Sequence, residues 1–420
     1  MYSYCTPTGL ILLSVLASIP AAATDGYFSN GYGTQCKGMA GACAARAQDA
    51  MGAANNPASM YWAGHRYDLG LNFFRPFRSF QVEGAPSGAP GTFGLAPGRV
   101  ESGSRLFLIP SFGANWRVRE GTSFGISVFG NGGMNTNYAS PVFGSQPAGV
   151  DLMQLFIAPT LAQRFAGKHS VGVSAILAWQ RFKAEGISAF APFSSDPAAL
   201  SNKGFAQSAG AGVKAGYMGA VHPRLTIGAY YQSRIKMGKF ERYRGLFAEA
   251  GGFDIPPAYT AGVTILPQSR ASFSVDVQRV LYSTVNSVGN PLLPNLMQVR
   301  LGDRNGAGFG WRDVTVGRFG VEVNPASGWM LRGGFSTSGQ PIPSSEVLFN
   351  ILAPGVIERH VAFGVTRALA GGKHVHFSMV HALEHTVRGA NPLEAPGRQS
   401  IQLRMRQWEF EVGFSFGAER

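Results

Sequence analysis

Short runs in which every second residue is apolar recur along the whole chain, and they restrict its possible folds more than any other feature. The final run is the clearest, and its apolar positions are Trp408, Phe410, Val412, Phe414 and Phe416. The residues between them are polar or small. Alternation with a period of two is typical of a β-strand whose two faces meet different surroundings. A soluble sheet can also show it, so the number and connection of the strands must decide the fold class.

We predict fourteen strands of this kind from the positions of the alternating runs. They lie at residues 66–80, 104–119, 122–136, 150–165, 168–185, 205–221, 224–236, 256–266, 270–283, 311–323, 328–338, 356–369, 373–388 and 400–416. The sixth strand, at 205–221, is mostly Gly and Ala, and its alternation is the weakest. Each strand reaches the roughly 9–11 residues with which a tilted strand crosses a bilayer.

The connections between these strands alternate between short and long. Tight turns such as 120–121 and 166–167 alternate with long segments such as 137–149 and 186–204. Outer-membrane barrels have short periplasmic turns and long outer loops, and closure removes the strand edges that lipid would not tolerate. We therefore predict an all-β fold, a transmembrane antiparallel β-barrel of about fourteen strands in a bacterial outer membrane, with both chain ends in the periplasm.

The composition agrees with such a barrel and excludes several other classes. Charged residues make up 14% of the chain, below the roughly 25% of soluble domains, whereas the mean hydropathy is only +0.03. No apolar run after residue 25 reaches the about 18 residues of a membrane helix. The net charge is +13, but the basic residues are scattered. We therefore predict no nucleic-acid partner and assign this charge to outer-membrane lipid and lipopolysaccharide.

The first residues have the features of an export signal. An apolar run at 10–20 precedes Ala21, Ala22 and Ala23, the small residues that a signal peptidase requires. We expect residues 1–23 to be a signal peptide, although residues 1–9 lack the usual Lys or Arg. A membrane-anchor helix is the alternative, and the shortness of the run stands against it.

Residues 24–64 do not alternate and precede the first strand. Their small, mildly polar composition suits a plug inside the lumen, but a periplasmic tail fits that composition equally well. Cys36 and Cys43 lie seven residues apart in a compartment that permits disulfides. Their spacing leaves a disulfide open, because the distance between Cα atoms decides it. We expect no metal here, since zinc sites usually need four ligands.

Four short motifs give the chain a resemblance to a known family. They are Gly38–Ala42, the pair Asp49-Ala50, the tripeptide Asn56-Pro57-Ala58 before the first strand, and the Gly-rich stretch Phe129–Gly133 in the third strand. With the strand pattern, they make the chain similar to the FadL/TodX transporters of the outer membrane. The resemblance implies a hatch at 24–64 inside a fourteen-stranded barrel at 65–420. It also implies a monomer without a cofactor that passes long-chain fatty acids or aromatic hydrocarbons without coupled energy.

The resemblance also suggests where a ligand would leave the barrel sideways. Gly weakens a strand and permits a bulge, so Gly130, Asn131, Gly132 and Gly133 are the candidate lateral gate in the third strand. A strand end leading into the loop at 137–149 is the alternative. The exit would spare a hydrophobic ligand the polar sugar layer and the aqueous periplasm.

Two further groups of residues receive roles with alternatives. Asn56, Pro57 and Ala58 are expected to fix the hatch to the barrel, because Pro restricts the backbone and the Asn amide can bond to it; a simple turn is the alternative. By alternation, Phe129, Phe182 and Tyr230 point inward. They are candidate ligand-pocket residues, although ordinary packing in the lumen would place them there as well.

A catalytic function has little support in the sequence. The stretch from His381 to His385 matches the His-x-x-Glu-His pattern of some zinc peptidases, which requires a helix. Its flanks alternate like a strand, in which the two histidines would lie about 13 Å apart. We therefore predict no enzyme, no catalytic residue and no metal.

The choice between transport functions is left open by the strand pattern alone. An open diffusion porin or a structural, adhesin-like barrel is the alternative to a hydrophobe transporter. The aromatic final strand suits the barrel-assembly machinery, although Gly417–Arg420 follow it.

Overall fold

The protein is described by a computed structural model that covers residues 26–268 and 270–417. The predicted signal peptide and its cleavage site after Ala23 lie outside the described residues. So do the last three residues, 418–420.

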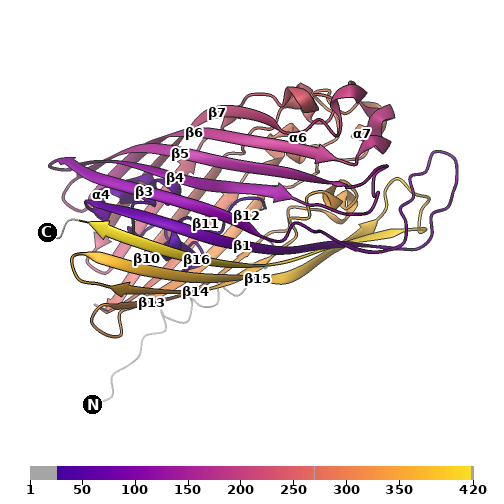
Figure 1. Cartoon of the computed structure of the whole chain (residues 1–420). Coiled ribbons are helices and arrows are strands. Elements are labelled where there is room, and N and C mark those ends of the chain that lie inside the picture. The colour runs from indigo at the N-terminus through magenta and orange to yellow at the C-terminus, as the bar shows by residue number, and fades with distance from the viewer. Residues whose placement is uncertain (1–25, 269, 418–420) are drawn as a thin grey trace, which may run out of the picture.

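Fourteen long strands form the wall, and each pairs with its neighbours in the chain in antiparallel fashion. They are β1 (Arg66–Glu83), β3 (Phe107–Arg119), β4 (Thr122–Asn135), β5 (Gly149–Phe165), β6 (His169–Glu185), β7 (Ala206–His222), β8 (Leu225–Gln232), β10 (Ala258–Gln268), β11 (Ala271–Val280), β12 (Val314–Val323), β13 (Trp329–Ser338), β14 (Arg359–Ala368), β15 (Lys373–Ala390) and β16 (Ser400–Gly417). The pairing of β16 with β1 closes the sheet into a barrel (Figure 1). The predicted fourteen-stranded barrel is confirmed, including its Gly/Ala-rich sixth strand.

Two short strands lie outside this wall. β2 (Gly98–Glu101) pairs with the last part of β1, at residues 79–82, and β9 (Lys236–Met237) pairs with β7. Both belong to the long connections, which gather at one end of the barrel (Figure 1).

Several strands begin later than the sequence predicts, and buried loop residues explain the difference. Trp311 was placed in a strand, but β12 begins at Val314. The Trp311 side chain is 1% exposed and donates a hydrogen bond to Asn350 at 2.6 Å. Val356 likewise lies buried before β14 begins at Arg359. The apolar pattern continues past the ladder because these long loops fold over the barrel and pack on its interior.

The two faces of the wall differ as alternation predicts. In β16, the inward Glu409 and Glu411 are 5% and 3% exposed, whereas the outward Phe410 and Val412 are 36% and 50% exposed. Apolar side chains thus form a belt around the outside. In the part of the chain that the structure describes, no helix is both long and apolar enough to cross a membrane.

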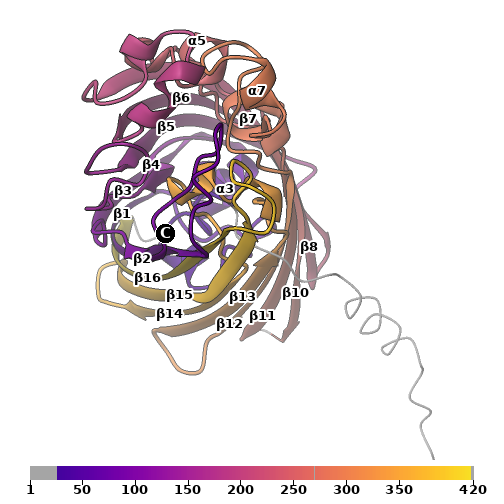
Figure 2. The same ribbon diagram turned by 90° about the vertical axis from the view of Figure 1, so that its right-hand side faces the viewer.

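Short helices fill the interior and the loops. Those before the wall are α2 (Thr34–Lys37), α3 (Gly52–Asn55), η1 (Pro57–Ser59) and α4 (Met60–Ala63). Those in the long loops are η2 (Ser188–Phe193), η3 (Pro197–Ala199), η4 (Glu241–Tyr243), α5 (Ala248–Gly251), η5 (Tyr282–Thr284), α6 (Asn286–Gly289), α7 (Asn295–Gln298), η6 (Ser344–Glu346) and η7 (Phe349–Ile351). The view along the barrel shows α3 within the ring of strands (Figure 2). We call the described part of this internal segment, residues 26–64, the hatch.

Candidate functional site: the hatch, the wall gap and two cavities

The Asn-Pro-Ala tripeptide joins the hatch to the wall through its backbone and one amide. Asn56 is fully buried, and its amide nitrogen donates to the carbonyl oxygens of Ala44 at 2.7 Å and Tyr217 at 3.0 Å. Its side-chain oxygen accepts from the backbone N–H of Ala58 at 3.1 Å, which caps η1. The carbonyl oxygen of Ala58 in turn accepts from the Ser170 hydroxyl of β6 at 2.9 Å.

Lys37 holds the hatch to the wall by ion pairs. Its ammonium group lies 2.8 Å from Glu409 and 3.1 Å from Glu411, both on β16, and all three side chains are buried. Burial alone would lower the pKa of Lys37, but the charges of the two glutamates outweigh it and raise this pKa above its ordinary range. The hatch therefore carries a fixed positive charge against this strand.

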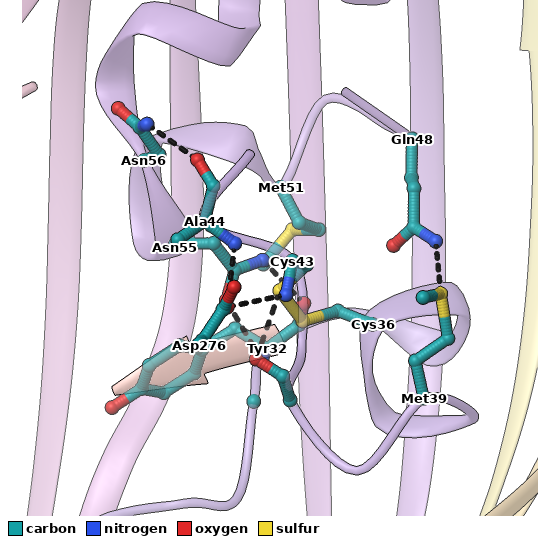
Figure 3. The surroundings of a disulfide bond; sticks show 12 residues. Tyr32, Cys36, Met39, Cys43, Ala44, Gln48, Met51, Asn55, Asn56 and Asp276 are labelled. Carbon is teal, nitrogen blue, oxygen red and sulfur yellow. Dashed lines mark hydrogen bonds between the residues drawn. A yellow bond between two sulfur atoms is a disulfide. The ribbon is translucent and has the colours of Figure 1, made fainter. Parts of the chain in front are cut away.

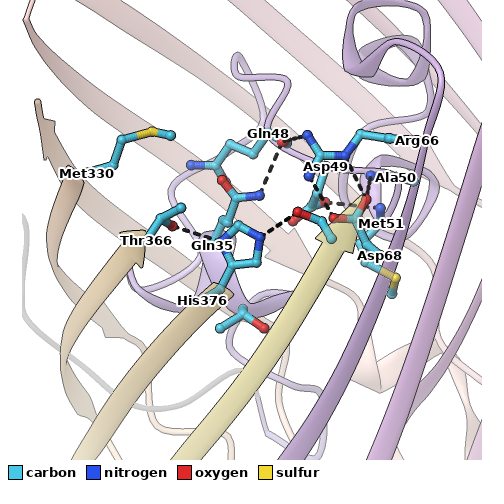
Figure 4. Close-up of polar contacts among 12 residues, drawn as sticks. Gln35, Gln48, Asp49, Ala50, Met51, Arg66, Asp68, Met330, Thr366 and His376 are labelled. Atoms are coloured by element: carbon cyan, nitrogen blue, oxygen red, sulfur yellow. Dashed lines mark hydrogen bonds and ion pairs between the residues drawn. The ribbon is translucent and has the colours of Figure 1, made fainter. Parts of the chain in front are cut away.

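A second polar cluster surrounds the end of the hatch nearest β1 (Figure 4). Arg66 forms a double hydrogen bond with Asp68 at 2.7 and 2.8 Å, and Asp68 accepts from the backbone N–H of Ala50 at 2.8 Å. Asp49 is 5% exposed. Burial and then the negative charge of Asp68 raise the pKa of Asp49 above its usual value.

A disulfide joins Cys36 to Cys43, whose Cα atoms lie 5.9 Å apart (Figure 3). Asp276 of β11 lies beside it and accepts hydrogen bonds from the backbone N–H groups of Cys43 and Ala44, each at 2.7 Å. The disulfide closes the turn at residues 36–43, and the N–H groups at the end of this turn donate to the Asp276 carboxylate. It thereby fixes another contact between hatch and wall.

Glycines of the wall allow the hatch backbone to approach closely. A Cβ built on Gly113, Gly172, Gly228 or Gly334 would lie 2.1 to 2.5 Å from backbone atoms of the hatch. No side chain fits at such a distance. The inner surface of the wall is therefore shaped to the hatch backbone rather than to its side chains.

The wall is interrupted between β3 and β4. The ladder between these strands ends at the pair Phe112 and Val128, although β4 continues to Asn135. Within β4, the register against β5 shifts between Gly130 and Gly132, which leaves Asn131 unpaired in a bulge. The stretch predicted as a gate thus lies where β4 keeps one neighbour and loses the other.

The start of the hatch occupies this interruption. Phe28 forms an isolated antiparallel bridge with Gly132. The Ser29 N–H donates to the carbonyl oxygen of Asn131 at 3.1 Å, and the Gly133 N–H donates to that of Tyr27 at 3.2 Å. We call residues 27–29 the N-terminal strap. Sequence reasoning missed this strap, because no local pattern indicates which segment pairs with a bulge.

An apolar cavity lies above the hatch, among the long loops. Its volume is about 30 Å³, and the side chains around it include Phe182, Phe190, Phe247, Phe309 and Phe349. Among the described residues that line it, none is charged. This volume would hold only about two water molecules, so a bound hydrocarbon would need the surrounding side chains to move apart.

The three predicted pocket residues separate into different places. Phe182 lines the apolar cavity. Tyr230 lines a second, polar cavity of about 30 Å³ together with Lys214, whose ammonium lies 5.2 Å from the centre of the Tyr230 ring. Phe129 is 2% exposed and packs against Tyr32 and Phe156, with ring centres 4.7 and 5.6 Å away. The three side chains therefore do not form one pocket.

The histidines of the zinc-like motif do not converge. His381 stacks on Trp408 with ring centres 3.8 Å apart, Glu384 pairs with Arg404, and His385 lies 2.8 Å from Glu358. All three belong to β15, and each has its own partner. Within residues 26–268 and 270–417, no group of three or more His, Cys, Asp or Glu side chains could hold a metal ion.

A closed wall with an apolar outer belt, an internal hatch and an interrupted strand pair define a plugged barrel of the bacterial outer membrane. The chain belongs to the family described as outer membrane protein transport protein (OMPP1/FadL/TodX), whose model matches residues 13–354. Both the resemblance and the outer-membrane location predicted from the sequence are confirmed. No curated protein sequence matches the chain.

Solved structures share this fold at low sequence identity. The toluene transporter TodX of Pseudomonas putida is 17% identical with a TM-score of 0.69, over 93% of this chain and 99% of TodX. A FadL homologue of Pseudomonas aeruginosa is 13% identical with a TM-score of 0.69, over 94% and 100%. The toluene transporter TbuX of Ralstonia pickettii is 18% identical with a TM-score of 0.64, over 93% and 99%.

Proposed function

We propose that this protein carries hydrophobic compounds, aromatic hydrocarbons or long-chain fatty acids, passively across the outer membrane and releases them sideways through its wall. The observation that carries the proposal is the interruption between β3 and β4 beside the bulge at Asn131, occupied by the N-terminal strap. A ligand that leaves there enters lipid directly. The barrel therefore does not release it directly into the aqueous periplasm, in which it dissolves poorly.

The apolar cavity is the proposed resting site before exit. Its aromatic lining offers burial of apolar surface, worth roughly 25 cal/mol per Å². Because its described lining has no cationic side chain to pair with a carboxylate, an uncharged aromatic hydrocarbon suits it better than a fatty acid. The related structures described as toluene transporters support this choice.

The strap is the proposed moving part. Tyr27 packs against Tyr282 and Trp311, with ring centres 5.4 and 5.7 Å away, and it belongs to the same buried apolar cluster as the cavity-lining Phe182 and Phe247. Displacement of residues 27–29 would therefore disturb this cluster and the bulge at Asn131 together, which is how we propose the exit opens. No energy source is required, because the ligand moves down its concentration gradient.

The open-porin alternative has less support. The hatch makes buried polar contacts with the inside of the wall, and the ion pairs of Lys37 with Glu409 and Glu411 are examples. An adhesin-like barrel would not need the gap.

The proposal also covers export and assembly. Residues 1–23 would be a cleaved signal peptide, residues 24–64 the hatch and residues 65–420 the barrel. The barrel-assembly machinery would insert the protein, which would act as a monomer and without catalysis.

A reversible covalent lock across the gap tests the exit. The Ile109 side chain lies 2.8 Å from the position of a Cβ on Gly130, so the pair Ile109→Cys and Gly130→Cys would join β3 to β4. We expect oxidised cells to lose uptake of labelled toluene and of a labelled fatty acid, and a reductant to restore it. The wild-type protein receives the same treatments.

A matched lock elsewhere supplies the control. Val321 and Gly333 stand opposite each other on β12 and β13, which are already paired, so Val321→Cys with Gly333→Cys should leave uptake unchanged. Normal uptake by a fully cross-linked gap variant would exclude lateral exit there. Passage of small sugars instead of either hydrophobe would favour the porin.

A further inference from the structure

The outer face of β16 changes from apolar to basic along the strand. From the periplasmic end, its outward side chains are Phe416, Phe414, Val412, Phe410 and Trp408, and then Arg406 and Arg404. On the neighbouring strand β1, Phe73 is followed outward by Arg75, which stands opposite Trp408. The apolar belt therefore ends at one level on both strands, and arginine begins there.

Arg75 and Arg406 meet over a single aromatic ring. Their guanidinium carbons lie 5.2 and 4.8 Å from the centre of Phe77, which stands opposite Arg406 in the register of β1 and β16. Both arginines are exposed. Among the described residues, no carboxylate forms an ion pair with either of them. The nearby carboxylate of Glu384 also attracts Arg406, but its ion pair is with Arg404.

A similar arrangement on β6, beside the start of β7, is neutralised. Arg181 and Lys183 lie 4.4 and 5.4 Å from the ring centre of Phe205. There, Asp151 lies 3.8 Å from Arg181, and Glu185 lies 2.8 Å from Lys183. The contrast shows that the cations at Phe77 are unusual in lacking acidic partners.

The surroundings of the Phe77 site add to its positive charge. Four nearby arginines form ion pairs with three glutamates. Arg99 on β2 and Arg105 in the loop after β2 pair with Glu101, Arg388 on β15 pairs with Glu83, and Arg404 on β16 pairs with Glu384. Because four arginines share three glutamates here, these pairs do not offset Arg75 and Arg406. The patch as a whole stays basic.

We propose that Arg75 and Arg406 bind a phosphate group of lipopolysaccharide whose acyl chains lie along the belt of β1 and β16. The lipid of the outer leaflet carries its phosphates where its acyl chains end, which is the level of Trp408. Arginine is suited to this ligand because its planar fork donates two parallel hydrogen bonds to phosphate oxygens. Phe77 holds the two guanidinium groups side by side in the absence of the anion.

Native mass spectrometry of the purified full-length barrel tests this site. The probes are bisphosphorylated lipid A and the same lipid A after removal of its phosphates. We expect the wild-type protein to retain the phosphorylated form, and Arg75→Gln with Arg406→Gln to lower its affinity by at least about tenfold. Binding of the dephosphorylated form should not change.

Two controls keep the proposal open to refutation. Arg181→Gln with Lys183→Gln removes the cation pair on β6 and should leave lipid A binding within about twofold. Equal affinities in the Arg75/Arg406 variant and the wild type would overturn the proposal. So would displacement of the lipid by millimolar inorganic phosphate, which would assign the pair to free phosphate. Heat-modified gel mobility verifies that each variant is folded.

Discussion

Phe28 pairs with Gly132 in an antiparallel bridge, and a Cβ on Gly132 would lie 1.7 Å from the carbonyl oxygen of Tyr27. The bulge in β4 and the strap that fills it therefore fit only because residue 132 has no side chain. This relationship links a kink in the wall to a segment of the hatch. A substitution at Gly132 therefore tests the role of the bulge.

Gly132→Leu should lower uptake of labelled toluene by roughly tenfold, or ~1.4 kcal/mol. The new side chain would occupy the interruption between β3 and β4 itself, so it would block the exit even though it displaces the strap. Because Gly132 meets the strap and not β5, β4 would keep its ladder with β5. A Cβ on Gly133 would lie 2.4 Å from the carbonyl oxygen of Leu152 on β5, so Gly133→Leu should also lower uptake but would disturb the ladder between β4 and β5. Gly333→Leu is the control, since only Val321 lies nearby, at 3.5 Å. Unchanged uptake by a folded Gly132→Leu protein would contradict the proposed exit.

Lys37→Met should weaken the docking of the hatch by about 3–5 kcal/mol, because it leaves Glu409 and Glu411 buried without a counter-ion. Hydrogen exchange of the amides in residues 34–44 measures this loss. Lys373→Met, at the exposed start of β15, should have no effect. Adding Glu409→Gln to Lys37→Met should recover part of the protection, and failure to do so would show that the ion pair is not the cause.

Asn56→Asp should weaken the docking of hatch residues 44–60 to the wall by at least ~2 kcal/mol of free energy. A carboxylate cannot donate to the carbonyl oxygens of Ala44 and Tyr217, and it would place a buried charge beside them. Protease cleavage within residues 44–60 reports the release. The chain supplies its own control in Asn324, which begins an identical Asn-Pro-Ala tripeptide in an exposed turn. Equal cleavage of Asn56→Asp and Asn324→Asp would refute the anchoring role.

Docking of the hatch should weaken as pH rises, because burial and the charge of Asp68 raise the pKa of Asp49 from 3.8 to about 7. A carboxyl with a raised pKa is protonated in the docked hatch and ionised in the released one between these values. Docking therefore takes up a proton, and it is favoured at the acidic end of this window. Protease sensitivity of the hatch at pH 5 and pH 8 measures the effect, and Asp49→Asn should remove it. Equal sensitivity of the wild type at both pH values would contradict the assignment.

The wall could be predicted from the sequence because its signal is local. In the stretch from Trp408 to Phe416, each residue reports which face it occupies without reference to a distant partner. The same local signal misplaces the ends of some strands. Trp311 and Val356 are apolar because they are buried in loops, and alternation cannot distinguish such burial from membership of a strand.

The candidate site was predicted only in part, because its contacts join distant segments. Lys37 and Glu409 are 372 residues apart, and no local pattern in the sequence indicates that they form an ion pair. Alternation placed Phe129, Phe182 and Tyr230 on the inner face. It carried no information on height along the barrel axis, which separates the three into different surroundings.

The close approach of the wall to the backbone of the hatch has a consequence for the divergence of related sequences. Gly113, Gly172, Gly228 and Gly334 meet carbonyl groups and peptide units, which every amino acid supplies in the same form. Hatch residues opposite them can therefore drift through evolution without losing the fit, whereas any replacement of these glycines removes it. The fit between hatch and wall therefore depends on glycines of the wall more than on the identity of the hatch residues that face them.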